Sequence, residues 1–352
     1  MTKRVLVTGG AGFIGHRVIE ELLAKTDYKV ISLDRLDTSG TLDRLDYVIQ
    51  SYQGDDIHQR LDIVWHDLKA AINPYVAERL GDVDIILHLG AGSHVDRSIE
   101  QPMEFVLDNV VGTANILDYA RSLSKLDLFL YFSTDEVFGP APKGVFYKEW
   151  DRYNSGNPYS ATKAGAEELC LAYANTYGLP MAISHTMNVI GHRQNKEKFV
   201  PLCIASSLTG SKVSIHANSE CTEAGSRHYI DVADVADAVL FLINKYLAGE
   251  LKRCDKYNIV GSEEIDNEAL YNLIWSETSK CSLGIDVARQ IPDPNYELVD
   301  FHSSRAGHDL RYALCGEKMR KLGWKPRTLR DRIQGIVSWY LENPNWLGVD
   351  SE

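Results

Sequence analysis

The chain has 352 residues, of which 44% are hydrophobic and 24% charged, a composition typical of a globular protein with one large or two modest domains. Its formal net charge of −12 argues against nucleic acid as a partner, because Lys and Arg contacts to phosphates supply most of that affinity. The six cysteines are scattered without a CxxC pair, and no apolar run approaches the roughly 18 residues that span a bilayer. We therefore expect a cytoplasmic protein with free thiols and no membrane partner.

Short strand-like runs alternate with helix-like segments through the first half of the chain. Strands are expected at residues 4–10, 29–34, 61–67, 83–91, 126–134 and 181–191. Helices are expected at residues 13–25, 103–122 and 157–178. Because the strands are continuously apolar and alternate with helices, they predict a parallel sheet covered on both faces, a Rossmann-type doubly wound α/β fold.

The pattern becomes less regular beyond about residue 190. We expect helices at 201–210, 232–249 and 329–343, and one last strand at 255–261 that returns to the sheet. The predicted organisation is an NAD-binding Rossmann domain of residues 1–187, joined by about 232–261. A smaller, mixed α/β substrate-binding domain is then formed by residues 188–231 and 262–352.

A glycine-rich stretch, VTGGAGFIGHRV, joins the first strand to the first helix. Its spacing of Gly9, Gly12 and Gly15 suits a tight turn that brings the backbone and a helix N-terminus against a pyrophosphate. The second strand ends in Asp34, where an acid that binds the ribose belongs, and a carboxylate there favours NAD over NADP. The adjacent Arg35 weakens this preference for NAD. A lone glycine motif is also compatible with a turn that binds no ligand.

The stretch FSTDEVFG at residues 132–139 ends an apolar strand in two hydroxyls followed by two carboxylates. Asp135 and Glu136 are either a solvated strand end, which is common, or an acid and a base held for catalysis. Two carboxylates this close cannot both ionise freely, so opposite protonation states are expected if they face a closed site.

Tyr159 and Lys163 lie four residues apart at the start of the helix at 157–178, so both side chains share one face. A neighbouring ammonium favours the tyrosine anion, which would let Tyr159 accept a proton from a substrate hydroxyl. Taken alone this spacing is usually a solvated helix face, but here it follows a dinucleotide loop and the hydroxyls of Ser133 and Thr134.

Several motifs occur together, in a fixed order, from residue 7 to about 326: TGGAGFIG, HLGAGSHVDRSI, DNVVGT, FSTDEVFG, PYSATKAGAE, NVIG with EKFVP, SRHYIDVADVADAV, YNIVG, and GHDLRYAL with LGWKP. With them the chain resembles the extended short-chain dehydrogenases/reductases. Within that superfamily it is similar to the nucleoside-diphosphate-sugar 4,6-dehydratases, above all to those that act on dTDP-glucose.

This resemblance implies the NAD-dependent conversion of a nucleoside-diphosphate hexose, with dTDP-glucose as the first expectation, into the 4-keto-6-deoxy sugar. Tyr159, with Lys163, would accept the proton of the C4 hydroxyl while C4 is oxidised, and Thr134 would bond that oxygen. Glu136 would then remove the C5 proton while Asp135 protonates the departing C6 hydroxyl, and hydride would return to C6.

The resemblance also implies binding roles by motif position. The residues implied for NAD are Gly9, Gly12, Phe13, Ile14, Gly15, Asp34, Asp67, Leu68, Leu89, Ala91, Ser93, Asn109, Ser133, Tyr159 and Lys163. Those implied for the sugar nucleotide are His94, Ser98, Thr134, Asn188, Glu197, Lys198, Arg227, Asn258, Arg305 and His308. No metal site is expected. A homodimer is implied, through the segments 103–122 and 159–177, although amphipathic helices there are equally compatible with core packing.

Three departures from the family pattern bear on the ligands. Gly92 stands where a glutamate beside the cofactor is usual, Ser262 to Glu264 replace an HNE stretch, and the loop at 189–198 lacks two prolines. The last two lie where the sugar and the nucleobase would bind. The nucleobase (dTDP, UDP, CDP or GDP) and the hexose therefore stay open.

Two other functions are compatible with parts of this pattern. A nucleotide-sugar 4-epimerase or decarboxylase of the same superfamily would use Thr134, Tyr159 and Lys163 without needing Asp135 and Glu136. A dinucleotide-binding sensor without turnover typically lacks the Tyr or the Lys, and this chain has both.

Overall fold

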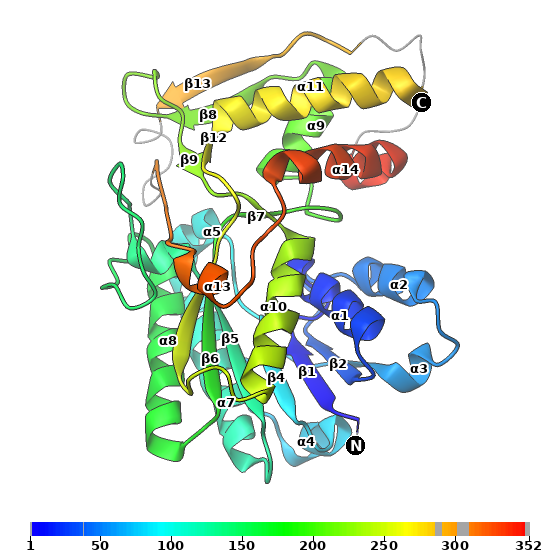
Figure 1. The fold of residues 1–352 in the computed structure, drawn as a ribbon, viewed down its shortest axis with the longest axis vertical. Helices are drawn as coiled ribbons and strands as arrows, with labels where there is room; N and C mark the ends of the chain where they lie inside the picture. The colour runs from blue at the N-terminus through cyan, green and yellow to red at the C-terminus, as the bar shows by residue number, and fades with distance from the viewer. Residues whose placement is uncertain (1, 38, 286–290, 301–309, 349–352) are drawn as a thin grey trace.

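A seven-stranded parallel sheet forms the centre of the protein, as the computed structural model shows for residues 2–37, 39–285, 291–300 and 310–348 (Figure 1). The strand order is β11-β6-β5-β4-β1-β2-β3, and every pair is parallel. The strands are β1 (Arg4–Thr8), β2 (Lys29–Asp34), β3 (Leu61–Trp65), β4 (Ile85–His88), β5 (Leu128–Thr134), β6 (Met181–Thr186) and β11 (Asp255–Ile259). The predicted fold class is confirmed.

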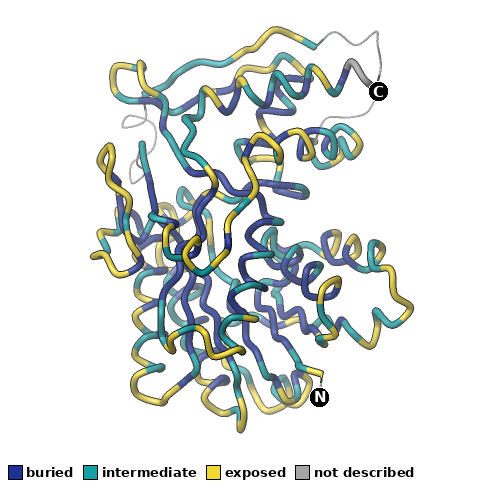
Figure 2. The backbone as a smooth tube through the Cα atoms, viewed as in Figure 1, coloured by how far each residue is buried: buried dark blue, intermediate teal, exposed yellow. Residues whose placement is uncertain are grey.

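Helices cover both faces of this sheet. Alternate side chains of β1 divide between the two layers: Val5 and Val7 enter one hydrophobic core and Leu6 the other. The first layer contains α1 (Phe13–Lys25), α2 (Leu42–Ser51), α3 (Ile57–Arg60), α10 (Val232–Leu247) and α13 (Glu317–Lys321). The second contains α4 (Pro74–Leu80), α7 (Gly112–Ser122) and α8 (Pro158–Tyr177). Strands buried from both sides explain the continuous apolar runs in the sequence (Figure 2).

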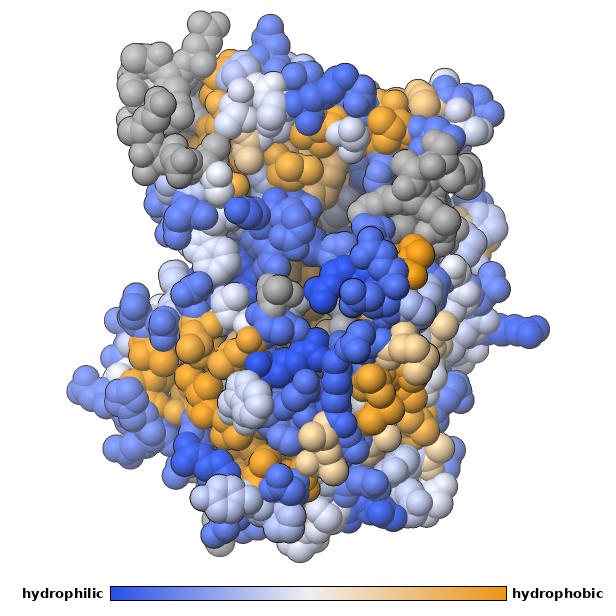
Figure 3. Space-filling view, turned by 180° about the vertical axis from the view of Figure 1, so that it is seen from behind, coloured by the Kyte–Doolittle hydropathy of each residue, from blue (hydrophilic) through white to orange (hydrophobic). Residues whose placement is uncertain are grey.

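A smaller part follows β6 and lies above the sheet in Figure 1. Its helices are α9 (Phe199–Thr209), α11 (Asn267–Ile285), α14 (Leu329–Glu342) and the 3₁₀ turn η3 (Pro344–Leu347). Its paired strands are β7 (Val189–Ile190) with β10 (Ile230–Asp231), β8 (Val213–Ala217) with β13 (Tyr296–Asp300), and β9 (Ser226–Arg227) with β12 (Ile265–Asp266). This part has its own hydrophobic core. Seen from behind, hydrophilic side chains fill the waist between the two parts (Figure 3). The domain boundaries expected at residues 187, 231 and 261 stay a prediction.

Several elements differ from the sequence-based expectation. The helix expected at 103–122 is α6 (Pro102–Phe105), a π-helical turn η1 (Val106–Val111) and then α7. Such π turns recur at functional sites, and this one carries Asn109. The helices α2, α3 and α11 were not expected. The first two lie in a polar stretch in which apolar residues do not recur with a clear helical period. The described residues also form the short helix α5 (Val95–Glu100) and the 3₁₀ turn η2 (Asp135–Phe138).

The strand order places a crevice at the carboxyl edge of the sheet. From β1 the chain continues to β2 on one side, while β4 pairs with β1 on the other, so the connections diverge between β1 and β4. Ligands of doubly wound sheets bind at such a switch point. No helix in the described ranges is long and apolar enough to cross a bilayer.

A buried charged cluster joins the strands on the other side of β5. Glu167 of α8 is fully buried and contacts Lys256 of β11 at 2.8 Å and His185 of β6 at 3.2 Å. Burial alone would raise the pKa of Glu167, but the charges and hydrogen bonds of His185 and Lys256 outweigh it and hold that pKa well below its usual range. The carboxylate therefore stays ionised in the fold.

We predict that Glu167→Gln lowers the free energy of unfolding by about 3–5 kcal/mol at pH 7, because it leaves Lys256 buried without its counter-ion. A carboxyl whose pKa is depressed in the fold contributes stability that is complete above its unfolded value, about 4.5, and is lost as the pH falls. The free energy of unfolding of the variant should therefore depend less on pH below about pH 4.5 than that of the wild type. Urea titrations at several pH values measure both effects. Glu168→Gln, at the next and exposed position, is the matched control, and equal losses in the two variants would contradict the account.

Candidate active site

A cleft of about 680 Å³ opens at the carboxyl ends of β1, β4 and β5. It contains most of the residues that the sequence assigns to the cofactor: Gly9, Gly12, Phe13, Ile14, Gly15, Asp34, Asp67, Leu68, Leu89, Ala91, Ser93, Ser133, Tyr159 and Lys163. Residues from six separate segments of the chain thus meet in one place, as expected if the carboxyl ends of parallel strands share one edge of the sheet.

The glycine loop makes one wall of the cleft. Gly9 has φ of +68°, and a Cβ there would lie 2.8 Å from Cα of Gly90 at the end of β4. A Cβ on Gly15 would overlap the carbonyl of Gly9, so α1 can approach the loop this closely only with glycine. Because the N-cap residue Gly12 has no side chain to cap the helix, the amides of its first turn face the cleft as an anion site.

Asp34 ends β2 and faces the same cleft. Its Oδ2 accepts a hydrogen bond from the amide of Ala11 at 3.0 Å, and its Oδ1 accepts one from the amide of Leu36 at 2.9 Å. Burial raises the pKa of Asp34, and the two backbone bonds act in the opposite direction. The carboxylate is therefore fixed between the glycine loop and the turn after β2, which is where a ribose would lie.

Asn109 is the one predicted cofactor residue that does not line the cleft. It is buried in the π turn, where its amide oxygen accepts from the backbone of Gly92 at 2.8 Å. Its amide nitrogen donates to the carbonyl of Gly92 and to the hydroxyl of Thr162. Asn109 therefore ties the wall of the cleft to α8, one turn beyond Tyr159.

Strand β5 ends at Thr134, and the turn η2 begins with Asp135 and Glu136. The hydroxyl of Thr134 donates to Oδ1 of Asp135 at 3.1 Å, while Oδ2 of Asp135 is buried without a partner among the described residues. Burial raises the pKa of Asp135 to about 6, against the opposing charge of Arg227. Asp135 is thus protonated at a pH where an ordinary aspartate is ionised.

Glu136 differs from its neighbour in its surroundings. Its side chain is partly exposed, and Oε2 accepts a hydrogen bond from the amide of Asn157 at 3.1 Å. Asn157 is also the N-cap of α8, where it accepts from the backbone of Ser160 in a capping box ahead of Pro158. The same amide therefore fixes both Glu136 and the start of the helix that carries Tyr159.

Tyr159 is 9% exposed, and it lines the cleft together with Thr134. Its backbone amide donates to Oγ of Ser98 at 3.1 Å. Burial, followed by the charge of Glu136, raises the pKa of Tyr159 above its usual value. The ammonium of Lys163 donates to the carbonyl of Phe132 at 2.7 Å, and the expectation that Lys163 favours the Tyr159 anion stays a prediction. Burial also lowers the pKa of Lys163 to about 8.

The residues predicted to bind the sugar nucleotide do not all line the cleft, unlike nearly all of those predicted for the cofactor. Thr134, His94, Glu197 and Lys198 line the cleft. Asn188 is exposed next to it, and Arg227 donates to the carbonyls of Ser226 and Leu310.

Two of the residues predicted to bind the sugar nucleotide, Ser98 and Asn258, are buried and do not line the cleft. Ser98 is buried under the start of α8, which its hydroxyl helps to position. Asn258 is fully buried in β11, and its amide bonds to His185, Tyr147 and Cys315, so the structure does not bring it to the cleft. Arg305 and His308 lie outside the described residues.

The sequence reading missed some residues that shape the site. Asn157 precedes Pro158 in an N-cap position that could have been recognised from the sequence, but its bond to Glu136 could not. Ser133 and Thr186 each have a buried hydroxyl in the cleft wall with no partner in the described part of the chain. Thr186 was not predicted, since it meets Thr134 only through the pairing of β5 with β6.

Known proteins resemble this chain over nearly all of its length. A family model described as GDP-mannose 4,6 dehydratase matches residues 6–334. A dTDP-glucose 4,6-dehydratase from Escherichia coli is 34% identical, covering 97% of this chain and 95% of the relative. A trifunctional UDP-glucose 4,6-dehydratase, 3,5-epimerase and reductase from Arabidopsis thaliana is 33% identical over 98% of this chain and 48% of its own length. The crystal structure of DesIV, a dTDP-glucose 4,6-dehydratase from Streptomyces venezuelae with NAD bound, has a TM-score of 0.81 and 32% identity, covering 97% of this chain and 98% of that one.

We predict that Asp135→Asn raises the free energy of unfolding at pH 7.5 by about 1–3 kcal/mol, because the buried carboxylate costs free energy once it ionises. A carboxyl whose pKa rises from 3.8 to about 6 on folding makes the protein less stable as the pH increases through that window. The gain should therefore shrink towards zero only below about pH 3.8, where Asp135 is neutral in both the folded and the unfolded state. Denaturant titrations at the two pH values measure this difference, and a variant less stable than the wild type at pH 7.5 would refute the assigned burial.

Proposed function

Because the chain belongs to the GDP-mannose 4,6-dehydratase family, within the nucleoside-diphosphate-sugar 4,6-dehydratases of the extended short-chain dehydrogenase/reductase superfamily, we propose that it dehydrates a nucleoside-diphosphate hexose. The product is the 4-keto-6-deoxy sugar, and the enzyme is a hydro-lyase. The observation that carries the proposal is the carboxylate pair Asp135 and Glu136, which directly follows Thr134 of the cleft wall and lies near Tyr159.

NAD is the cofactor, and the cleft fits it at three points. The uncapped first turn of α1 suits the pyrophosphate, and Asp34 suits the ribose hydroxyls. The unpartnered hydroxyls of Ser133 and Thr186 lie where a carboxamide would satisfy them. When bound, NAD supplies the acceptor for the hydride from C4 and its donor to C6.

In the oxidation step the protein's task is to move one proton. Tyr159 accepts the proton of the C4 hydroxyl, and Thr134, which lines the same cleft, holds the same substrate oxygen. Burial and the charge of Glu136 raise the pKa of Tyr159, so a nearby positive charge is needed to favour the phenolate. Lys163, whose ammonium lies in the same pocket, is the side chain that supplies it.

Elimination requires a base and an acid at neighbouring carbons. The C4 ketone acidifies the hydrogen at C5, and Glu136, which is partly exposed, removes it as the base. Asp135 keeps its proton up to about pH 6 and delivers it to the C6 hydroxyl, which leaves as water. The different burial of the two side chains supports giving them different roles.

dTDP-glucose is the first substrate to expect, since relatives of that activity match the chain end to end. The nucleobase has to be tested, because the chain is similarly identical to a UDP-glucose 4,6-dehydratase and also matches a GDP-mannose 4,6 dehydratase family model. We also propose a homodimer through residues 103–122 and 159–177, where Met103 is 65% exposed.

Incubation of the purified protein with dTDP-, UDP-, CDP- and GDP-hexoses should yield a 4-keto-6-deoxy product from at least one of them. Such products are read by their absorbance in alkali and by mass spectrometry, as a loss of water that leaves the nucleotide intact. A reaction that gives only C4 epimers, or only loss of carbon dioxide from a hexuronate, would place the chain with the other members of the superfamily.

A second prediction separates oxidation from elimination. Asp135→Asn removes the proton donor for C6 while Thr134 and Tyr159 remain, so the variant should oxidise C4 and then stall, which lowers turnover by about 10²–10⁴-fold. The stall appears as absorbance of the reduced nicotinamide during a single turnover. Asp151→Asn, at an exposed carboxylate outside the cleft, is the control. Loss of both steps together in Asp135→Asn would contradict its role as the acid.

A further inference from the structure

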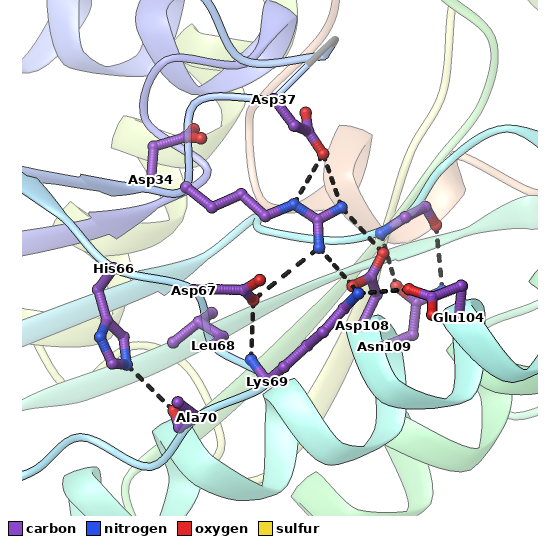
Figure 4. A network of polar contacts seen from close by, with 12 residues as sticks. Asp34, Asp37, His66, Asp67, Leu68, Lys69, Ala70, Glu104, Asp108 and Asn109 are labelled. Carbon is purple, nitrogen blue, oxygen red and sulfur yellow. Dashed lines mark hydrogen bonds and ion pairs between the residues drawn. The ribbon is translucent and has the colours of Figure 1, made fainter.

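A network of ionic side chains lies at the end of the cleft near Asp34 (Figure 4). Within it, Arg35 forms ion pairs with Asp37, Asp67 and Asp108. Arg35 follows directly after Asp34, the last residue of β2. Its Nε donates to Oδ2 of Asp37 at 2.7 Å. Its two terminal nitrogens donate to the two carboxylate oxygens of Asp108 at 2.5 and 3.0 Å, a bidentate pair.

Asp108 reaches Arg35 from a distant element. It lies in the π turn η1, next to Asn109, and its side chain is 9% exposed while that of Arg35 is 28% exposed. Lys69 approaches the same carboxylate at 3.5 Å and pairs with Glu104 at the rim. Asp108 is therefore the most buried carboxylate of the group that contacts Arg35.

The glycine at position 92 makes room for this carboxylate. A Cβ on Gly92 would lie 3.1 Å from Oδ2 of Asp108 and 3.2 Å from the ring of Phe105. A side chain at position 92 would therefore press on Asp108 while it is bonded to Arg35. Glycine at position 92, where the family pattern has a glutamate, thus gives Asp108 of the π turn the space to lie next to Arg35.

The position of Arg35 gives this pair a consequence for the cofactor. In doubly wound dinucleotide sites an acid at the end of the second strand binds the ribose of NAD, whereas a nearby arginine accommodates the 2′-phosphate of NADP. The chain has both groups, Asp34 and Arg35, side by side. The hydrogen bond and charge of Asp108 raise the pKa of Arg35 further, so the guanidinium is tightly committed to protein carboxylates. To meet a 2′-phosphate it would have to give up the bidentate pair.

We propose that Asp108 determines cofactor specificity by holding Arg35 away from a 2′-phosphate, and that Asp108 and Asp34 together make the site selective for NAD over NADP. Asp108 is a positioning residue that acts through Arg35. The inference rests on the dinucleotide site of the proposed function but not on the dehydration itself.

The test is the equilibrium binding of NAD⁺ and NADP⁺ to the purified full chain, measured by calorimetry without any sugar nucleotide. Asp108→Asn should improve the affinity for NADP⁺ relative to NAD⁺ by at least about tenfold, because the guanidinium loses its anionic partner. Glu104→Gln is the matched control: it removes a charge from the same network but contacts Lys69 instead of Arg35, and should leave the ratio within about twofold. Equal ratios in both variants and the wild type would overturn the proposal.

Two further variants show whether the effect passes through Arg35. Asp108→Asn combined with Arg35→Ala should return the ratio to that of the wild type. Arg35→Ala alone should leave the weak NADP⁺ binding of the wild type unchanged, and a further loss would show that Arg35 already contacts the 2′-phosphate and overturn the proposal even if Asp108→Asn fails to fold. A wild type that binds both cofactors equally would overturn it too, whereas product formation in the sugar-nucleotide assay reports separately on the proposed function.

Discussion

The parallel pairing of β5 between β4 and β6 is the constraint on which the site depends. All seven residues of β5 are buried, and the register places Thr134 opposite Thr186 at the carboxyl edge. A strand held on both sides cannot shift without moving every side chain to the wrong face. Its end therefore presents Ser133 and Thr134 to the cleft at fixed positions, and the next two residues have to turn away as η2. The bond between Asn157 and Glu136 then fixes α8 relative to that turn.

The burial that makes this strand end rigid also sets its chemistry. It raises the pKa of Asp135 and of Tyr159 and lowers that of Lys163, so burial favours the neutral form of all three side chains. For Asp135 this is the form that the proposed role as an acid requires. The fold is shared by dehydratases and epimerases, so the proposal of dehydration depends on the two carboxylates and not on the fold.

The sheet, most of its helices and the cofactor loop could be predicted from the sequence because each depends on local periodicity or on a glycine spacing. The π turn could not, since its extra residue leaves the apolar pattern of a helix almost unchanged. Contacts between distant elements were also out of reach: Asp108 on Arg35, Asn157 on Glu136 and the burial of Asn258 follow from how the layers pack. The direction of the Lys163 ammonium, towards Phe132, is likewise a consequence of packing around β5.

The central claim is that one active site oxidises C4, eliminates water across C5 and C6, and returns the same hydride to C6. Its most direct test is turnover, in deuterated water, of a sugar nucleotide carrying deuterium at C4, followed by NMR of the product. The account predicts the C4 deuterium at C6 and a solvent deuterium at C5, where Glu136 exchanged its proton. Deuterium that stays at C4, with no solvent label at C5, would show an epimerase-type reaction and contradict the account.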